Sequence, residues 1–249
     1  MVGKKCYACA MMVFFDLDRT LMDFERAESY GIEAVFSRYS DEISMKYDVF
    51  SSAWKKWAQT FFDRYSAGEL TFDQQRRLRV AKVFELNGFP IKDDVELEKR
   101  FALYWQTYEK EYTLFDDARD VLKILHDREV PMGIITNGDS KNQRAKLKRA
   151  GITNLFDPVI VSSEVGFSKP DERIFQKALK EAGCLPQESL YVGDSFDHDI
   201  VPARKLGMNC LHLVRGRESP LQIESQQPLF AIVKDFWEVL AIIEKYHCG

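Results

Sequence analysis

Two aspartates, Asp16 and Asp18, follow directly on an apolar run that ends at Phe15. If that run is a strand, the alternation of side chains places both carboxylates on the same side, where the strand passes into a loop. Two neighbouring carboxylates repel each other unless a cation or a shared proton offsets the repulsion. The pair therefore indicates a site, although a single Asp-x-Asp on a loop is common and the motif alone leaves the question open.

Two further motifs contain groups that can bind an anion. Thr136-Asn137-Gly138 joins a hydroxyl to a flexible turn whose backbone amides can face a negatively charged ligand, but alone it is a weak signal. Segment 168–170, Ser-Lys-Pro, precedes a helical pattern, and its proline restricts Lys169 to extended geometry, which fixes the direction of the ammonium group. A solvated lysine is the usual alternative for such a residue.

A fourth motif, residues 193–199, reads Gly-Asp-Ser-Phe-Asp-His-Asp and opens a helix. Its carboxylates, Asp194, Asp197 and Asp199, are dense enough to favour a divalent cation. Helix capping is the alternative interpretation of Asp197. His198 lies in the same segment, but no histidine of the chain has a partner pattern typical of a Ser/His/Asp triad.

Short apolar runs place these motifs at the ends of strands. Five runs are predicted as strands: 11–15, 132–135, 159–161, 190–192 and 210–214. From the second run onward, one helical pattern separates each strand from the next. Strands that alternate with helices in this way form a parallel sheet that is covered on both faces and binds ligands at the carboxyl ends of its strands.

Two of the helical patterns are clear. Residues 117–127 repeat apolar side chains at i, i+3, i+4 and i+7, which gives one buried helix face. A second helix is expected after Asp171, whose side chain suits an N-cap, and it should end before Gly183. Other helices are expected to end at Gly151 and Gly207.

A long gap between the first strand and Tyr112 interrupts this alternation. Its segments 52–66, 71–86 and 94–112 read as helices, so the gap is predicted to be an inserted helical unit. Many of its aromatic side chains recur at helical spacing, which favours packing in the core of a small bundle over a stacking platform for a ligand. They are Trp54, Trp57, Phe61, Tyr65, Phe101, Tyr104, Trp105 and Tyr108.

Composition narrows the class of ligand. The 249 residues are 45% hydrophobic and carry a formal net charge of -4. The chain can therefore bury a substantial core, but it lacks the concentrated positive field that a binder of nucleic acids or membrane surfaces needs. No apolar run reaches about 18 residues, and the N-terminal segment has no small-residue cleavage site. We expect a cytoplasmic protein that acts on a small molecule, as a monomer or a homodimer.

Five cysteines are scattered through the chain, an odd set in a protein large enough not to need disulfides. Reduced thiols are the simple interpretation. Cys6 and Cys9 form a Cys-x-x-Cys pair, but one pair supplies two ligands where a structural zinc needs four, and no second pair follows. No zinc site is predicted.

Taken together and in this order, DxDxT, TNG, SKP and GDSxxxD resemble the motifs of the haloacid dehalogenase superfamily of phosphohydrolases. The combination is far more specific than any of its parts. The resemblance implies an α/β fold with a Rossmann-like three-layer parallel-sheet core in residues 1–21 and 112–249. It also implies that residues 22–111 are an all-helical C1-type cap that sets substrate specificity, as in the nucleotidases, sugar-phosphate phosphatases and phosphoglycolate phosphatase-like members.

The resemblance implies a role for each motif residue. Asp16 resembles the nucleophile that attacks phosphorus, and Asp18 resembles the acid that protonates the departing oxygen and then activates water. The residues that would bind the phosphoryl group are Thr136, Asn137, Gly138 and Lys169. Magnesium would be held by Asp16, the main-chain carbonyl of Asp18 and Asp194, with Asp199 either as a further ligand or as a support for the others. Thr20 and Ser195 would support these groups.

The second aspartate distinguishes among members of the superfamily. Dehalogenases have no alkoxide to protonate and usually lack an acid at that position, so Asp18 favours phosphate over halide. Arg19 departs from the residues frequent at its position, and it either points to solvent or helps to attract phosphate. Met22, Asp23 and Phe24 are expected at the hinge between core and cap, where they could touch substrate.

The sequence thus predicts a magnesium-dependent phosphatase that hydrolyses a small phosphomonoester, such as a nucleotide or a sugar phosphate, through a phospho-aspartate. A phosphomutase or a phosphonate hydrolase on the same core is an alternative; the latter would need a cap lysine for an imine, and nothing marks one as activated. A non-catalytic module that binds phosphorylated ligands is a third possibility, against which the intact Asp16 and Asp18 argue.

Overall fold

The computed structural model describes residues 11–216, 221–224 and 228–247. The Cys6/Cys9 pair, for which no zinc site was predicted, lies outside these residues. The described chain forms two compact units.

The sheet unit contains the described residues up to Met22 and from Leu114 onward, and the helical unit spans Asp23–Thr113. The sequence analysis placed the corresponding boundaries after residues 21 and 111. The structure therefore assigns Met22 to the sheet unit and Asp23 to the helical unit.

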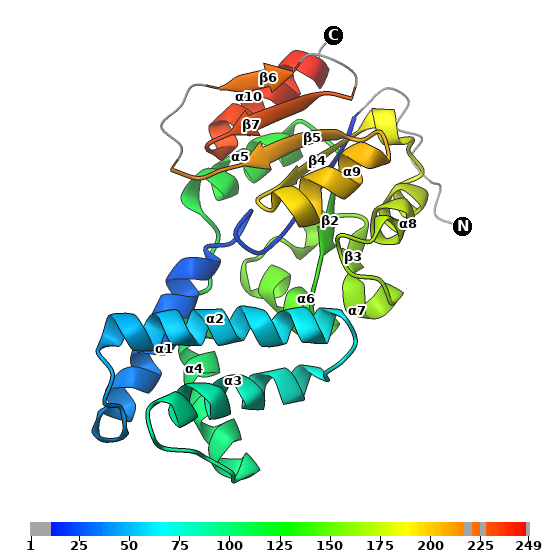
Figure 1. Ribbon diagram of the computed structural model, residues 1–249. Helices are drawn as coiled ribbons and strands as arrows, with labels where there is room; N and C mark the ends of the chain where they lie inside the picture. The colour runs from blue at the N-terminus through cyan, green and yellow to red at the C-terminus, as the bar shows by residue number, and fades with distance from the viewer. Residues whose placement is uncertain (1–10, 217–220, 225–227, 248–249) are drawn as a thin grey trace. The chain divides into compact units, whose positions relative to one another are not determined.

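The sheet unit is built on a seven-stranded sheet (Figure 1). In spatial order its strands are β3 (Val159–Val161), β2 (Met132–Thr136), β1 (Met12–Phe15), β4 (Ser189–Gly193), β5 (Asn209–Leu213), β7 (Phe230–Val233) and β6 (Gln222–Glu224). Neighbouring strands are parallel, except that β6 and β7 are antiparallel. The predicted α/β fold class is confirmed: the five predicted strands are β1 to β5, and β7 and β6 extend the sheet.

Helices precede or follow most of these strands along the chain. They are α5 (Asp116–Asp127), α6 (Ser140–Arg149), α7 (Ser162–Val165), α8 (Glu172–Ala182), α9 (Val201–Lys205) and α10 (Phe236–His247), with short turns η2 (Thr153–Leu155), η3 (Pro186–Glu188) and the π-helical η4 (Phe196–Ile200). The Asp171 side chain caps α8 by accepting from Arg173 N, and the helix ends at Gly183 in the left-handed conformation, φ 69°. Both signals were predicted from the sequence.

Successive residues of β1 pack on opposite faces of the sheet, because side chains alternate along a strand. Phe14 belongs to a buried cluster with Phe175 of α8 and Ala203 of α9. Phe15 stacks on Phe236 of α10, with the two ring centroids 5.9 Å apart. The sheet is therefore the middle of three layers, as the sequence implied.

The helical unit contains α1 (Phe24–Arg38), η1 (Ser40–Glu42), α2 (Tyr47–Ser66), α3 (Phe72–Leu86) and α4 (Asp94–Glu111). The last three correspond to the predicted helices, whereas α1 was not predicted. α3 begins with a capping box between Thr71 and Gln74. α1 passes close to α4 at Gly31, where an added Cβ atom would lie 2.7 Å from the Tyr104 ring.

Aromatic side chains form the core of the helical unit. Trp54, Phe61, Phe84, Phe101, Tyr104 and Tyr108 are buried. Core packing, which helical spacing favoured, is thereby confirmed for five of them: Trp54, Phe61, Phe101, Tyr104 and Tyr108. Trp57, Tyr65 and Trp105 are half-buried.

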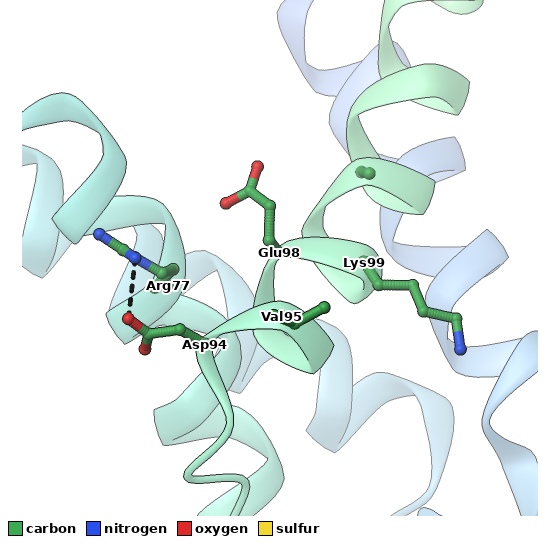
Figure 2. A pocket seen from close by; sticks show the side chains of 6 residues that line it. Arg77, Asp94, Val95, Glu98 and Lys99 are labelled. Carbon is green, nitrogen blue, oxygen red and sulfur yellow. Dashed lines mark hydrogen bonds and ion pairs between the residues drawn. The ribbon is translucent and has the colours of Figure 1, made fainter.

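A shallow hollow of about 370 Å³ lies on α3 and α4 of the helical unit (Figure 2). Its lining residues are Arg77, Asp94, Val95, Glu98, Lys99 and Ala102. Arg77 and Asp94 form an ion pair there, with 2.9 Å between Nη1 and Oδ2. None of the four sequence motifs contributes to this hollow, so it is not the candidate site.

Close packing at Gly133 of β2 can be tested by mutation. An added Cβ atom would lie 2.8 Å from Phe14 Cδ1 and 2.9 Å from Met12 Cε. Because both side chains are buried, we expect Gly133→Ala to lower the free energy of unfolding by about 1–3 kcal/mol in urea denaturation. Phe14→Leu should recover part of this loss in the double variant. Strictly additive losses would show that the two residues are not in this contact.

Candidate active site

The loop after β1 begins at Asp16, whose backbone amide donates to Val192 O of β4 at 2.9 Å. The chain then turns back, with Met22 N donating to Leu17 O at 3.0 Å. This turn brings Thr20 Oγ1 to 3.2 Å from Asp16 Oδ2, to which it donates a hydrogen bond. Thr20, the residue expected to support the site, thus holds the carboxylate of Asp16.

Three carboxylates meet beside the end of β1. Asp16, Asp194 and Asp199 each offer one ligand oxygen, and these oxygens lie within 4.8 Å of one another. Asp199 belongs to the π-helical turn η4, in which Ile200 N donates to Ser195 O at 3.3 Å. π-helical turns are rare and frequently occur at functional sites. We refer to these three residues as the acidic cluster.

Lys169 is bound within this cluster. Its Nζ lies 2.6 Å from Asp16 Oδ1, 2.6 Å from Asp199 Oδ1 and 3.0 Å from the hydroxyl of Tyr191. The Asn137 side chain fixes the backbone of Lys169: Oδ1 accepts from Lys169 N at 2.7 Å, and Nδ2 donates to Lys169 O at 2.9 Å. The second and third sequence motifs therefore meet directly, and one positions the other.

Burial dominates the electrostatics of the acidic cluster. It raises the pKa of Asp16 to about 8, against the opposing charge of Lys169. It also raises the pKa of Asp194 to about 6, and the charge of Asp199 adds to this rise. Burial alone would lower the pKa of Lys169, but Asp16 and Asp199 outweigh it and raise that pKa above its ordinary value. Lys169 therefore stays charged, and without a further cation the crowded carboxyl groups Asp16 and Asp194 relieve their mutual repulsion by holding protons more tightly.

The turn after β2 contains the predicted phosphate-binding groups. Thr136 is 1% exposed, and its Oγ1 accepts a hydrogen bond of 2.7 Å from Gln143 Nε2. The amide of Gly138 donates to Ser162 Oγ at 2.9 Å. This amide, which was expected to contact phosphate, thus already has a side-chain acceptor that the sequence did not reveal.

Asp18 has different partners from Asp16. Lys146 Nζ lies 2.7 Å from Asp18 Oδ1 and 3.0 Å from Oδ2, and Gln143 Nε2 donates to Oδ2 at 3.1 Å. Gln143 and Lys146 stand three residues apart on α6, so they share one helix face. Neither residue was selected from the sequence. Their spacing on the helix directly after the Thr-Asn-Gly motif is the signal that could have revealed them.

The structure separates the three carboxylates of the fourth motif. Asp194 and Asp199 belong to the acidic cluster, whereas Asp197 is exposed. The residue that caps η4 is Ser195, whose Oγ accepts from His198 N at 3.3 Å. The interpretation of Asp197 as a helix cap is therefore wrong. Ser195, expected to support the site, also donates its backbone amide to Asp199 Oδ2 at 3.0 Å.

The residues expected at the hinge have structural partners. Met22 is 1% exposed. Asp23 caps α1 with its side chain, and Phe24 packs edge-on against Tyr108 of α4, with ring centroids 5.8 Å apart. Contact of these residues with substrate stays a prediction.

Basic residues beyond Lys169 also act on this region. Burial raises the pKa of Asp194, and the charge of half-buried Arg19 offsets part of the rise. His212 Nε2 lies 3.0 Å from Asp194 O, and Arg215 Nη2 donates to Thr20 O at 3.2 Å. No sequence pattern selects His212 or Arg215, because near the site they contact main-chain carbonyls, and the carboxylate partner of Arg215, Asp117, lies 98 residues away in the chain.

Comparison with protein families decides the class of this protein. The family described as haloacid dehalogenase-like hydrolase matches residues 13–213, a span that contains all four motifs. The chain belongs to the haloacid dehalogenase-like hydrolases. The resemblance found in the sequence is confirmed.

Relatives within this family are named as phosphatases and nucleotidases. A ribulose-1,5-bisphosphate 5-phosphatase from Halopiger xanaduensis is 30% identical over 214 residues, which cover 84% of this chain and 87% of that protein. The pyrimidine 5'-nucleotidase YjjG from Escherichia coli is 31% identical over 212 residues, 84% of this chain and 88% of that protein. A glyceraldehyde 3-phosphate phosphatase from Methanothermobacter thermautotrophicus is 41% identical over 97 residues, but this match spans only 39% of this chain and 43% of that protein. The predicted enzyme class, a phosphoric monoester hydrolase of this family, is confirmed.

Solved structures share the fold. The HAD-hydrolase YfnB from Bacillus subtilis, in a magnesium-bound crystal form, aligns with a TM-score of 0.76 at 22% identity and covers 94% of this chain and 99% of its own. The L-2-haloacid dehalogenase from Xanthobacter autotrophicus aligns with a TM-score of 0.64 at 21% identity, over 84% of this chain and 79% of its own. At such identities the likeness shows the fold alone. Among the described residues, no helix has the length and apolar character needed to cross a membrane.

The raised pKa values link stability to pH when divalent cations are removed. The pKa values of Asp16 and Asp194 in the folded chain lie above the ordinary value of 3.8, so both side chains hold their protons more tightly there. The stability that protonation contributes is therefore fully present below pH 3.8 and is lost as the pH rises through about 6 and about 8. Asp16→Asn has no charge to bury. In EDTA, we expect the melting temperature of this variant, relative to the wild type, to increase from pH 5 to pH 9.

Asp120→Asn is the matched control, because Asp120 is exposed on α5. Its melting temperature relative to the wild type should stay constant over the same pH range. A difference between Asp16→Asn and the wild type that is equally independent of pH would show that the folded chain does not raise the pKa of Asp16.

Proposed function

We propose that this protein is a magnesium-dependent phosphatase that transfers the phosphoryl group of a small phosphomonoester first to Asp16 and then to water. The observation that carries this proposal is the buried contact of Lys169 with Asp16 and Asp199, beside Asp194. Phosphoryl transfer requires mainly in-line positioning and stabilisation of charge on the phosphoryl oxygens. A fixed carboxylate next to a fixed cation meets both requirements.

Asp16 is the nucleophile in this proposal. Its Oδ1 contacts Lys169 at 2.6 Å, and its Oδ2 accepts from Thr20 at 3.2 Å. Contacts on both oxygens restrict rotation of the carboxylate and so fix the direction of attack. Attack forms a bond between an Asp16 oxygen and phosphorus and breaks the bond from phosphorus to the alcohol oxygen, which leaves with the electron pair.

Asp18 is the acid and base. Its side chain is 27% exposed, so it can exchange protons with solvent between turnovers. Asp18 gives a proton to the leaving alkoxide and then takes one from the water that hydrolyses the phospho-aspartate. A halide would leave without a proton, so the second carboxyl group supports ester hydrolysis over dehalogenation.

The acidic cluster fits magnesium. All three donors are carboxylate oxygens within 4.8 Å of one another, and Mg²⁺ prefers hard oxygen ligands. The residues that would hold the ion are Asp16, Asp194, Asp199 and the main-chain carbonyl of Asp18. When bound, the ion would neutralise charge on the phosphoryl oxygens.

The substrate in this proposal is a small phosphorylated metabolite, such as a nucleotide or a sugar phosphate, and not a polymeric nucleic acid. The names of the relatives that cover most of the chain support this class. The helical unit, Asp23–Thr113, would act as the cap that selects the ester. We further propose a cytoplasmic location, with which the free thiols of Cys184 and Cys210 agree, and a monomer or homodimer.

Phosphate release from a panel of nucleotides, sugar phosphates and other phosphomonoesters tests the proposal. We expect turnover with Mg²⁺ and none with EDTA. Asp16→Asn should lower kcat at least about a thousandfold, because an amide cannot form the phosphoenzyme. Asp120→Asn should keep the wild-type rate. Equal rates for Asp16→Asn and the wild type would refute the assignment of Asp16 as the nucleophile. Full activity in EDTA would refute the requirement for a metal ion.

A further inference from the structure

We propose that Lys146 and Gln143 are positioning residues that hold the acid–base group of Asp18 beside the phosphate-binding hydroxyl of Thr136. This inference rests on the proposed function, because it assigns both residues to that reaction. Neither residue belongs to the four sequence motifs. Both lie on the buried face of α6.

Lys146 binds both oxygens of the Asp18 carboxylate, at 2.7 Å and 3.0 Å. The side chain of Lys146 is only 9% exposed, and that of Asp18 is 27% exposed. A lysine so far removed from water needs a close counter-charge, which distinguishes this contact from an ordinary surface ion pair. Because both carboxylate oxygens are engaged, Lys146 limits the orientations that Asp18 can adopt.

Gln143 connects Asp18 to the phosphate-binding turn. It is 3% exposed, and its Nε2 lies 3.1 Å from Asp18 Oδ2, 2.7 Å from Thr136 Oγ1 and 3.1 Å from Asn137 O. An amide nitrogen has two protons for these acceptors, and the shortest contact is to the hydroxyl of Thr136. Because Asp18 Oδ2 and Thr136 Oγ1 both contact this one nitrogen, the two oxygens lie close together. An acid that protonates the leaving oxygen must lie beside the bound phosphoryl group, and this arrangement places it there.

The contact also orients the hydroxyl of Thr136. A hydroxyl that accepts from Gln143 keeps its own proton for another acceptor. The acceptor within reach in the structure is Asn137 O, with 3.4 Å between the two oxygens, which is a long hydrogen bond. A phosphoryl oxygen can replace so weak a partner. Gln143 therefore prepares Thr136 to donate to the phosphoryl group.

The ends and flanks of α6 keep these two side chains in place. The Asp139 side chain caps the helix. Arg144 pairs with Glu164 of α7, with 2.7 Å between Nε and Oε1 and 2.8 Å between Nη2 and Oε2. Since Gln143 and Lys146 share one face, a single helix orientation serves the acid–base group and the phosphate-binding hydroxyl together.

The role of Lys146 can be tested with two aryl esters whose leaving groups differ in their need for protonation. Phenyl phosphate releases a basic phenoxide that benefits from a proton, whereas 4-nitrophenyl phosphate releases a stable anion. We expect Lys146→Met to lower kcat/KM for phenyl phosphate roughly ten- to a hundredfold, but for 4-nitrophenyl phosphate by less than about threefold. Lys146→Arg should recover part of the lost selectivity. Lys148→Met, a change at an exposed position of α6, should match the wild type on both esters.

Inorganic phosphate tests the role of Gln143. Because Thr136 loses its oriented proton, Gln143→Leu should raise the inhibition constant of phosphate roughly fivefold, the effect of about one hydrogen bond. An unchanged constant would overturn this part of the inference. Melting temperatures identify variants that fail to fold, and Lys146→Gln then replaces Lys146→Met in the same comparison.

The outcomes separate this inference from the proposed function. If the wild type hydrolyses both esters and Lys146→Met lowers both kcat/KM values equally, or lowers neither, Lys146 does not position the acid and the inference alone is overturned. If the wild type releases phosphate from no ester at all, the proposed function fails and the inference fails with it.

Discussion

The ion pairs of Lys169 with Asp16 and Asp199 are the interaction on which the rest of the site depends. Lys169 is 5% exposed and its two partners are 6% and 1% exposed, so these charges must satisfy one another. Removing one partner of a buried ion pair costs on the order of 3–5 kcal/mol. One lysine does not balance the carboxylates of the acidic cluster, and burial raises the pKa of Asp16 to about 8. The cluster is therefore short of positive charge, which is the condition that a divalent cation relieves.

The sheet explains how these charges come together in a chain that is otherwise stabilised by apolar packing. β1 and β4 pair in parallel, with Phe15 opposite Val192, so the aspartates that follow them leave the sheet at the same edge. The π-helical turn η4 then brings Asp199 back toward the strand end. Gly193 makes room for it, because an added Cβ atom would lie 2.5 Å from Asp199 Oδ2. The close approach of these buried charged groups thus depends on a few local features of the backbone.

Local patterns in the sequence predicted most of the fold, but they did not predict contacts between residues that lie far apart in the chain. Asp16 could be placed at a strand end because alternation and apolar runs are local features. The contact of Lys146 with Asp18 could not be predicted, because helical spacing shows only that Lys146 shares a face with Gln143, and its partner lies 128 residues away. Tyr191 reads as an ordinary strand residue, and strand period gives the face of a side chain but not what its hydroxyl contacts. Capping by Asp197, the alternative considered from the sequence, is wrong because spacing cannot distinguish an α-helical start from the π-helical turn that makes Ser195 the cap.

Chemical trapping of the phosphoenzyme would identify the residue that attacks phosphorus. Borohydride reduces an acyl phosphate to an alcohol, so a phosphorylated aspartate becomes homoserine, which mass spectrometry of the peptides detects. The enzyme would be quenched during turnover of 4-nitrophenyl phosphate and then reduced. We expect homoserine in place of Asp16. Steady phosphate release without that product, or with homoserine at another aspartate, would contradict the assignment of Asp16 as the nucleophile.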